Sequence, residues 1–231
     1  MPRKPRRELA GGVFHVFARG VDRRRIFLDD LDRQMYLHLL GGVSRRQEWA
    51  CLAYCLMDNH MHALLQTPEP NLGAGMRRLN GTYAQVFNER YARSGHLFER
   101  RFNDRGIASV RSIVTVAAYI AANPVEAHLV ATPEAWPWSS HAALAAGTEP
   151  RWLDAERLHA LIEAEGGDAT ERYLAALAER VAAAREGAAP QPGAGAAENG
   201  ATLEPGAAAE LGATLEPGAV ADPSARTALA A

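Results

Sequence analysis

The chain has 231 residues, of which 48% are hydrophobic and 23% are charged, with a formal net charge of −2 at pH 7. This composition is typical of a folded globular chain and excludes a fibrous or wholly disordered one. No apolar stretch approaches the roughly 18 residues that span a bilayer, and the basic start at residues 1–9 lacks the apolar segment of a signal peptide. We therefore expect a cytoplasmic protein with no membrane partner.

Charge is distributed unevenly along the chain. Residues 1–150 carry 19 Lys and Arg against 14 Asp and Glu, a net charge of +5, whereas residues 151–231 carry 6 against 13, a net charge of −7. Arginine supplies almost all of the positive charge, and its planar guanidinium suits phosphates and the edges of bases. Clusters at 3–7, 23–25, 77–78 and 100–101 fit a nucleic-acid-binding surface. For any single cluster, a solvated surface explains the charges equally well.

The hydrophobic pattern predicts alternating strands and helices along the first 123 residues. A strand is expected over 13–20, ending at glycine, and a helix over 29–46. Two strand-like runs, 48–57 and 60–67, are separated only by the two-residue turn Asp58-Asn59. A second helix from about 71 to 94, a strand around 100–107 and a helix over 109–123 that Pro124 stops complete the series. This order predicts an α+β, ferredoxin-like fold, with a four-stranded antiparallel sheet and helices on one face.

The chain ends in a region of different composition. Residues 151–186 predict one or two further helices, whereas from about residue 187 Ala, Gly, Pro and Glu dominate and the octamer GATLEPGA occurs twice, at 200–207 and 212–219. Two such copies cannot form a solenoid, and the region has almost no large apolar residues, so we expect a disordered acidic tail. The predicted organisation is a folded domain over 1–148, a helical extension over 149–187 and the tail over 188–231.

Two histidines stand out in the predicted hairpin, within the segment CLMDNHMHALLQ at 55–66. If Asp58-Asn59 is the turn, Met57 pairs with His60 and Cys55 with His62. Because residues alternate across a strand, both imidazoles lie on one face of the hairpin. The opposite face, expected to meet the core helices, carries Leu52, Tyr54, Leu56, Met61, Ala63 and Leu65. Two neighbouring imidazoles on one face indicate a site for a metal ion.

The residues leave the partners of this pair open. Cys55 either completes a zinc site with the histidines or is a small buried hydrophobic residue, which is the commoner role of a lone cysteine. In the predicted helix 109–123, Tyr119 projects opposite the apolar stripe, and Asn123 lies close to Tyr119 in projection. Asn123 precedes a proline and is either a helix C-cap or, with Tyr119, part of a site that combines a nucleophile with an oxygen ligand.

Five segments follow one another in an order that resembles the REP-associated tyrosine transposases, which belong to the single-tyrosine HUH transposases. These segments, within about residues 9–145, are FHVFARGVDRRRIF, YCLMDNHMHALLQTPEPNL, LNGTYAQVFNERYARSGHLFERRF, YIAANPVEAHLV and WPWSS. The resemblance implies that residues 1–148 form the catalytic domain, that His60, His62 and Asn123 bind a divalent metal, Mg²⁺ or Mn²⁺, and that Tyr119 is the nucleophile. It also implies cleavage and rejoining of single-stranded DNA at hairpin sites through a 5′-phosphotyrosine intermediate.

The resemblance further implies contact with a DNA hairpin and its single-stranded flank, and therefore a protein associated with the nucleoid. Guanidinium groups follow phosphates, and indole rings stack on bases. The DNA-binding candidates are Arg19, Arg23, Arg24, Arg77, Arg78, Arg100, Arg101 and Trp138. Whether the protein acts as a monomer or a homodimer stays open.

Two positions depart from the family pattern. Relatives commonly read Met-Pro-Asn-His where this chain has Asp58 in place of the proline, and an acid there would bind metal or repel phosphate. Relatives also carry a lysine where this chain has Asn103-Asp104. Three interpretations follow: a DNA strand transferase, a DNA-binding protein of the same fold that no longer cleaves, and a small zinc-binding module that uses Cys55, His60 and His62.

Overall fold

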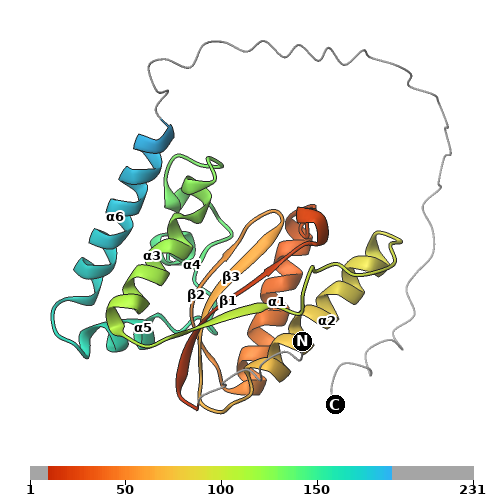
Figure 1. Cartoon of the computed structure of the whole chain (residues 1–231), viewed down its shortest axis with the longest axis horizontal. Coiled ribbons are helices and arrows are strands. Elements are labelled where there is room, and N and C mark those ends of the chain that lie inside the picture. Colours follow the sequence, from red (N-terminus) through yellow and green to blue (C-terminus); the bar gives the residue numbers. More distant parts are fainter. Residues whose placement is uncertain (1–9, 189–231) are drawn as a thin grey trace, which may run out of the picture. The chain divides into compact units, whose positions relative to one another are not determined.

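A four-stranded antiparallel sheet organises residues 10–188, the part of the chain that this computed structural model describes. The strands are β1 (Gly12–Arg19), β2 (Ala50–Leu56), β3 (His60–Thr67) and β4 (Asn103–Ile107), in the order β2-β3-β1-β4 (Figure 1). With α1 (Asp30–Gln47) after β1 and α2 (Leu72–Arg90) after β3, the predicted α+β, ferredoxin-like fold is confirmed. The basic cluster at 3–7 and the predicted tail beyond residue 188 lie outside the described residues.

The hairpin of β2 and β3 has the predicted register. Cys55 lies opposite His62, and the backbone N–H of Met57 donates to the carbonyl of His60. The register shifts between Cys51 and Ala53, which is a bulge. The bulge moves Leu52 to the same face as Leu64, so the prediction that Leu52 faces the other way is wrong.

Helices cover both faces of the sheet (Figure 1). On one face, α1 and α2 bury Tyr36 and Leu79 against Met61 of β3. On the other, α3 (Val110–Glu126) and α5 (Ala155–Glu163) pack with Leu64 in a second apolar cluster. The prediction of helices on one face therefore holds for α1 and α2 and is wrong for α3. The physical reason is that the apolar stripe of α3 also needs cover, and α1 and α2 already fill the first face.

The helix α3 extends past the proline predicted to stop it. Pro124 lacks the N–H that would bond to the carbonyl of Ile120, but the helix ends two residues later at Glu126, so the loss falls in its last turn. Against α3 packs α6 (Ala169–Ala188), where Leu177 meets the small side chains Ala118, Ala121 and Ala122. The short elements are α4 (Ser140–Ala145), η1 (Val21–Arg23) and η2 (Pro133–Ala135). None of the described helices combines the length and the apolar character that crossing a membrane requires.

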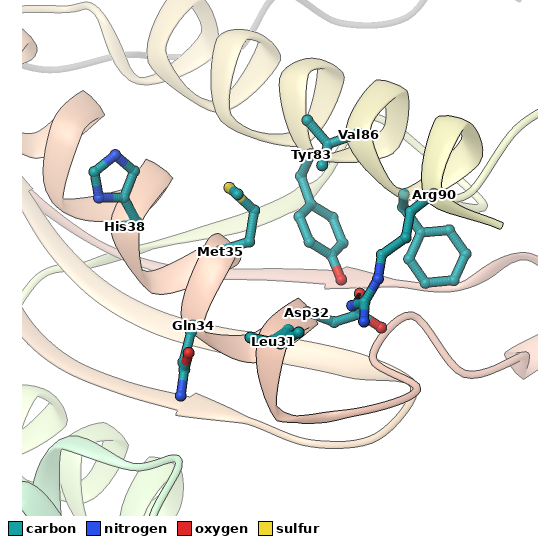
Figure 2. Close-up of a pocket in the computed structure, with 9 residues that line it drawn as sticks. Leu31, Asp32, Gln34, Met35, His38, Tyr83, Val86 and Arg90 are labelled. Atoms are coloured by element: carbon teal, nitrogen blue, oxygen red, sulfur yellow. Dashed lines mark hydrogen bonds and ion pairs between the residues drawn. The ribbon is translucent and has the colours of Figure 1, made fainter. Parts of the chain in front are cut away.

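An apolar pocket of about 410 Å³ opens between α1 and α2 (Figure 2). Leu31, Met35 and Phe87 provide apolar lining, while its charged members Asp32 and Arg90 bind each other at 2.7 Å. Since α1 and α2 lie across the sheet from α3, this pocket is separate from the histidine pair. Its charged groups are paired with each other, and none of its lining residues belongs to the predicted site.

Candidate active site

Imidazole and phenol rings gather on the α3 face of the sheet. The antiparallel register places Arg19 of β1 opposite His60 and Phe17 opposite His62. The ring centres of His60 and His62 are 5.0 Å apart, and the ring of Tyr119 on α3 lies 5.4 Å from that of His62, at an interplanar angle of 78°. The structure thus brings together three predicted site residues that come from two separate elements.

The turn residue Asn59 fixes the protonation of His60. Its side-chain Nδ2 donates to the carbonyl of Arg23 at 3.0 Å, which assigns the amide orientation and turns Oδ1 toward Nδ1 of His60 at 2.6 Å. An amide oxygen only accepts hydrogen bonds, so Nδ1 of His60 carries the proton. Nε2 of His60 is then the nitrogen with a lone pair to offer to a metal.

A third histidine, His15 of β1, contacts His62. Its Nε2 lies 3.0 Å from Nδ1 of His62, and the two rings stack with centres 5.1 Å apart. When His62 binds a metal through Nε2, its Nδ1 carries the proton and donates to His15. Both histidines of the predicted pair therefore have Nδ1 engaged by a neighbour and present Nε2 on the same side of the sheet.

Burial keeps the imidazoles neutral. It lowers the pKa of His60 from 6.5 to about 4, with Arg19 as the second cause, while a side-chain hydrogen bond with Asn123 acts in the opposite direction. Burial and then Arg105 lower the pKa of His15 to about 4. Burial, followed by the charge of His60, lowers the pKa of His62 well below its usual value. Neutral imidazole is the metal-binding form, so no proton has to leave this pair at neutral pH.

Asn123 occupies a buried position within α3, one turn after Tyr119. It is 7% exposed, and the C-cap of α3 is Ala127, so the alternative prediction of Asn123 as the cap is wrong. Its Nδ2 donates to the carbonyl of Tyr119 at 2.9 Å, which leaves Oδ1 as the group available to a ligand. The contact with His60 noted above places this amide beside the histidine pair.

The donor set fits a divalent metal with one amide ligand. Among residues 10–188 no three His, Cys, Asp or Glu side chains group closely enough to hold a metal, so two imidazoles require a donor of another kind. The amide oxygen of Asn123 meets that need, and nitrogen with oxygen donors suits several divalent ions. Cys55 does not, because it is fully buried in the apolar cluster with its Sγ 3.7 Å from Sδ of Met57. Burial also raises the pKa of the Cys55 thiol, so the zinc-module interpretation loses its third ligand.

The DNA-binding candidates fall into two groups. Arg19, Arg23 and Arg24 lie at the end of β1 and in the turn that follows, beside His60. Gly20 makes this turn possible, since a Cβ there would lie 2.1 Å from the carbonyl oxygen of Arg24. The second group lies on α2 and on the loop before β4, where it is exposed; its members are Arg77, Arg78, Arg100 and Arg101.

Backbone contacts connect these two groups. Gly20 bridges to Phe98, and Val21 donates to the carbonyl of Leu97. Three arginines of the second group, Arg77, Arg100 and Arg101, line a pocket of about 240 Å³ with Leu97 and Phe98. Basic side chains therefore run from the histidine pair across one end of the sheet to α2.

Trp138 lies in a packed segment beside β2. The carbonyl of Trp138 accepts from the N–H of Leu56, and its ring lies 5.5 Å from the guanidinium carbon of Arg33. The side chain is half-buried. The segment thus has a structural role, and base stacking by Trp138 remains a prediction.

Both departures from the family pattern have a defined place. The carboxylate of Asp58 binds the buried Arg33 through Oδ1 and lies 3.3 Å from Arg25 through Oδ2. Its charge is therefore compensated by two arginines. Asn103 and Asp104 begin β4, where they pair with Phe17 and Val16 of β1.

His15, Asn59 and Arg180 were missed by sequence reasoning as residues of this site. His15 shares a strand face with Arg19, but only the β1–β3 register shows that this face meets His62. In the sequence, Asn59 is recognisable only as part of the hairpin turn. Arg180 comes from α6, where the guanidinium carbon lies 4.8 Å from the centre of the Tyr119 ring, and no spacing in the sequence predicts that contact.

Residues 11–123 match the family described as "Transposase IS200 like". The chain belongs to the IS200-like transposase family. The matched range includes both histidines of the pair, Tyr119 and Asn123, and ends before α5 and α6. This is an HUH family of single-strand DNA nucleases.

One solved structure shares the fold of this IS200-like chain. A REP-associated tyrosine transposase bound to a REP hairpin matches with a TM-score of 0.54 and 23% identity, over 65% of this chain and 89% of that one. A transposase candidate from Deinococcus radiodurans R1 matches with a TM-score of 0.37 and 17% identity, over 52% of this chain and 95% of that one. Comparison with curated proteins gives no match.

Proposed function

We propose that this IS200-like protein is a REP-associated tyrosine transposase, active or domesticated, which cleaves and rejoins single-stranded DNA at hairpin sites through a 5′-phosphotyrosine. One observation carries the proposal: the ring of Tyr119 packs against His62, and the imidazoles of His62 and its neighbour His60 are both neutral and both present Nε2. A nucleophile beside a metal-binding pair is the arrangement that phosphoryl transfer to a side chain requires. A protein that acts on DNA hairpins in this way would associate with the nucleoid.

The side chains have distinct tasks in this reaction. His60, His62 and the amide oxygen of Asn123 would hold Mg²⁺ or Mn²⁺, which supplies charge withdrawal from the scissile phosphate. The phenolic oxygen of Tyr119 attacks phosphorus as it loses its proton, and the bond from phosphorus to the 3′ oxygen breaks as that oxygen gains one. One ester replaces another, so the same groups can catalyse the reverse step and rejoin the strands.

The arginines would carry the DNA toward Tyr119. Arg19 faces the histidine pair, and its charge would offset that of a phosphate placed there. The basic surface continues from Arg19 to Arg77 and Arg101, which suits the longer phosphate backbone of a DNA hairpin stem. The solved relative bound to a REP hairpin supports this choice of substrate.

A second candidate function is hairpin binding without cleavage. It is favoured by Asn103 and Asp104, which stand where relatives carry a lysine. In that case the same arginines would bind DNA while Tyr119 forms no covalent bond with it. A regulatory protein of the same fold would behave in this way.

Incubation with a labelled hairpin oligonucleotide that carries a single-stranded flank, in the presence of Mn²⁺, separates the two functions. Wild-type protein is expected to form an adduct that resists SDS, and Tyr119→Phe should abolish it because phenylalanine has no nucleophilic oxygen. Tyr91→Phe, on the other face of the sheet, is the matched control and should retain the adduct. Binding without any adduct would reject the strand-transferase proposal and support the second function.

A further inference from the structure

Arg180 of α6 lies over the proposed nucleophile. Its guanidinium carbon is 4.8 Å from the centre of the Tyr119 ring, within the range of a cation–π contact. The family match ends at residue 123, so α6 is outside the segment that defines the family. Nothing in the reaction described above requires this helix, yet it reaches the ring of the reacting residue.

The guanidinium is anchored rather than free to rotate. Nε and Nη2 of Arg180 lie 2.9 and 2.8 Å from the same carboxylate oxygen of Glu126. Glu126 stands seven residues after Tyr119 on α3, which places the two on the same side of the helix, two turns apart. Both side chains of the ion pair are 31% exposed, so the contact is only partly screened by water.

Other contacts hold α6 against the domain without Arg180. Leu177 packs on the alanines of α3, and the hydroxyl of Tyr173 lies 3.0 Å from Nδ1 of His141. Nε2 of His141 in turn lies 2.9 Å from the carboxylate of Glu134. The helix therefore has its own attachment, and the contact of Arg180 with Tyr119 is additional to it.

The ring of Tyr119 is restrained from two directions. His15 and His62 meet it edge-on, both at 78°, with ring centres 5.8 and 5.4 Å away. Arg180 lies over the ring itself. A phenol that attacks phosphorus in line must keep its oxygen within a narrow range of positions, and a restrained ring meets that need at low entropic cost.

We propose that Arg180 is a positioning residue for Tyr119, so that the C-terminal helix α6 forms part of the active site. Glu126 fixes the guanidinium, and the guanidinium fixes the ring. This inference rests on the proposed function, since it assigns Arg180 a role in the attack by Tyr119. It extends the site beyond the family segment and makes cleavage depend on residues 169–188.

The alternative is that Arg180 only docks α6, and the variants are chosen to separate the two roles. Arg180→Ala removes the contact, Arg180→Lys keeps a positive charge near the ring, and Glu126→Gln removes the anchor. Arg185→Ala is the matched control, because Arg185 is an exposed arginine of the same helix whose guanidinium donates to the carbonyl of Ala131.

Two measurements on the full chain test the proposal. The first is the rate of adduct formation at saturating hairpin DNA, alongside the Kd for the same DNA. Arg180→Ala should slow the adduct by roughly 5- to 30-fold, the range of a partly buried cation–π contact, with Kd changed less than about threefold. Arg180→Lys and Glu126→Gln should fall between wild type and Arg180→Ala, and Arg185→Ala should match wild type. An unchanged rate in Arg180→Ala, or a loss of the same size in Arg185→Ala, overturns the proposal.

The second measurement needs no cleavage. Protein labelled with 3-fluorotyrosine at its six tyrosines is studied by ¹⁹F NMR, with the resonance of Tyr119 assigned by its loss in Tyr119→Phe. Arg180→Ala should shift and broaden this resonance, while Arg185→Ala should leave it unchanged. A resonance that does not respond to Arg180→Ala overturns the positioning role. If wild type forms no adduct while the resonance does respond, the proposed cleavage fails and the restraint of the ring by Arg180 stands.

Discussion

On the α1/α2 face of the sheet, a buried carboxylate meets an opposite charge, whereas on the α3 face buried imidazoles meet mainly one another. Asp32, with a side chain 4% exposed, accepts from Arg90 and the backbone N–H of Leu28 at 2.7 Å and from the hydroxyl of Tyr91 at 2.9 Å. On the other face, His15, His60 and His62 share a small volume, and burial lowers the pKa of each. The first arrangement satisfies its polar groups within the chain; the second leaves nitrogen lone pairs exposed to a ligand.

The polar residues on the α1/α2 face therefore stabilise the fold, whereas the imidazoles on the α3 face are kept available to bind a ligand. A carboxylate with three partners stabilises the helices it connects. Buried bases with no acid to pair them lower stability in acid and are retained where a ligand compensates for the burial. The contrast therefore predicts that substitutions on the two faces change different properties, and four experiments test this, from the largest expected effect to the smallest.

Replacing both His60 and His62 by alanine should give the largest effect, on activity alone. Loss of two of the three proposed metal ligands is expected to reduce adduct formation by at least about 10³-fold, while the folded state persists because the α1/α2 core is untouched. Adduct formation with Mn²⁺, calorimetric titration with Mn²⁺ and circular dichroism measure the three properties. His128→Ala and His159→Ala together, outside the site, provide the matched control. Retention of Mn²⁺ binding by the double variant would contradict the assigned ligands.

The opposite outcome is expected for Asp32→Ala on the α1/α2 face. Removing the carboxylate leaves the N–H of Leu28 and the hydroxyl of Tyr91 without their acceptor and takes away one of the two carboxylates that bind Arg90, which should lower the free energy of unfolding by about 2–3 kcal/mol. The adduct rate per folded molecule should stay within twofold of wild type. Urea denaturation measures the change, and Asp30→Ala, whose side chain is 74% exposed, should cost less than about 0.5 kcal/mol. Equal losses in the two variants would show that the buried network adds no stability.

The sequence predicted the hairpin register and the shared face of His60 and His62, because a two-residue turn and strict alternation determine both. Through the family resemblance and a helical projection, it predicted Tyr119 and Asn123 as residues of the site. It could not predict that Leu52 changes face, since a bulge depends on how β2 packs rather than on its own residues. The contacts of His15 and Arg180 depend on strand pairing and helix docking between distant segments. No local pattern encodes them.

The free energy of unfolding should depend on pH because of the buried imidazoles on the α3 face. With metal removed by EDTA, the unfolded chain binds protons at His15 and His60 near pH 6.5, whereas the folded protein resists them down to about pH 4. The unfolded state binds more protons in that window, so stability is complete above pH 6.5 and falls as pH decreases toward 4. We expect a loss on the order of 2 kcal/mol for each of these two histidines between pH 7 and 5 in urea denaturation.

Two features make this pH window specific to the histidines. The pKa of Asp29 is lowered by its hydrogen bond with Arg90, and that of Glu134 by its hydrogen bond with His141, so these carboxylates titrate below their usual range and outside the window. His60→Asn should reduce the slope of stability against pH between 7 and 5. An unchanged slope in this variant would show that His60 takes up its proton equally in both states.

The smallest effect is expected for Asp58→Asn, which tests whether the departure from the family pattern disturbs DNA binding. Asp58 is bound to Arg33 and lies beside Arg25, so its charge is already compensated before a phosphate approaches. Affinity for a hairpin, measured by fluorescence anisotropy, should change less than about threefold, and the salt dependence should stay the same. Arg19→Ala, by comparison, should weaken binding and reduce the salt slope by about one, as expected for a lost phosphate contact. A gain of tenfold or more in Asp58→Asn would mean that this carboxylate repels the substrate despite its two arginines, and that this chain has weakened a site whose histidines, tyrosine and asparagine are all in place.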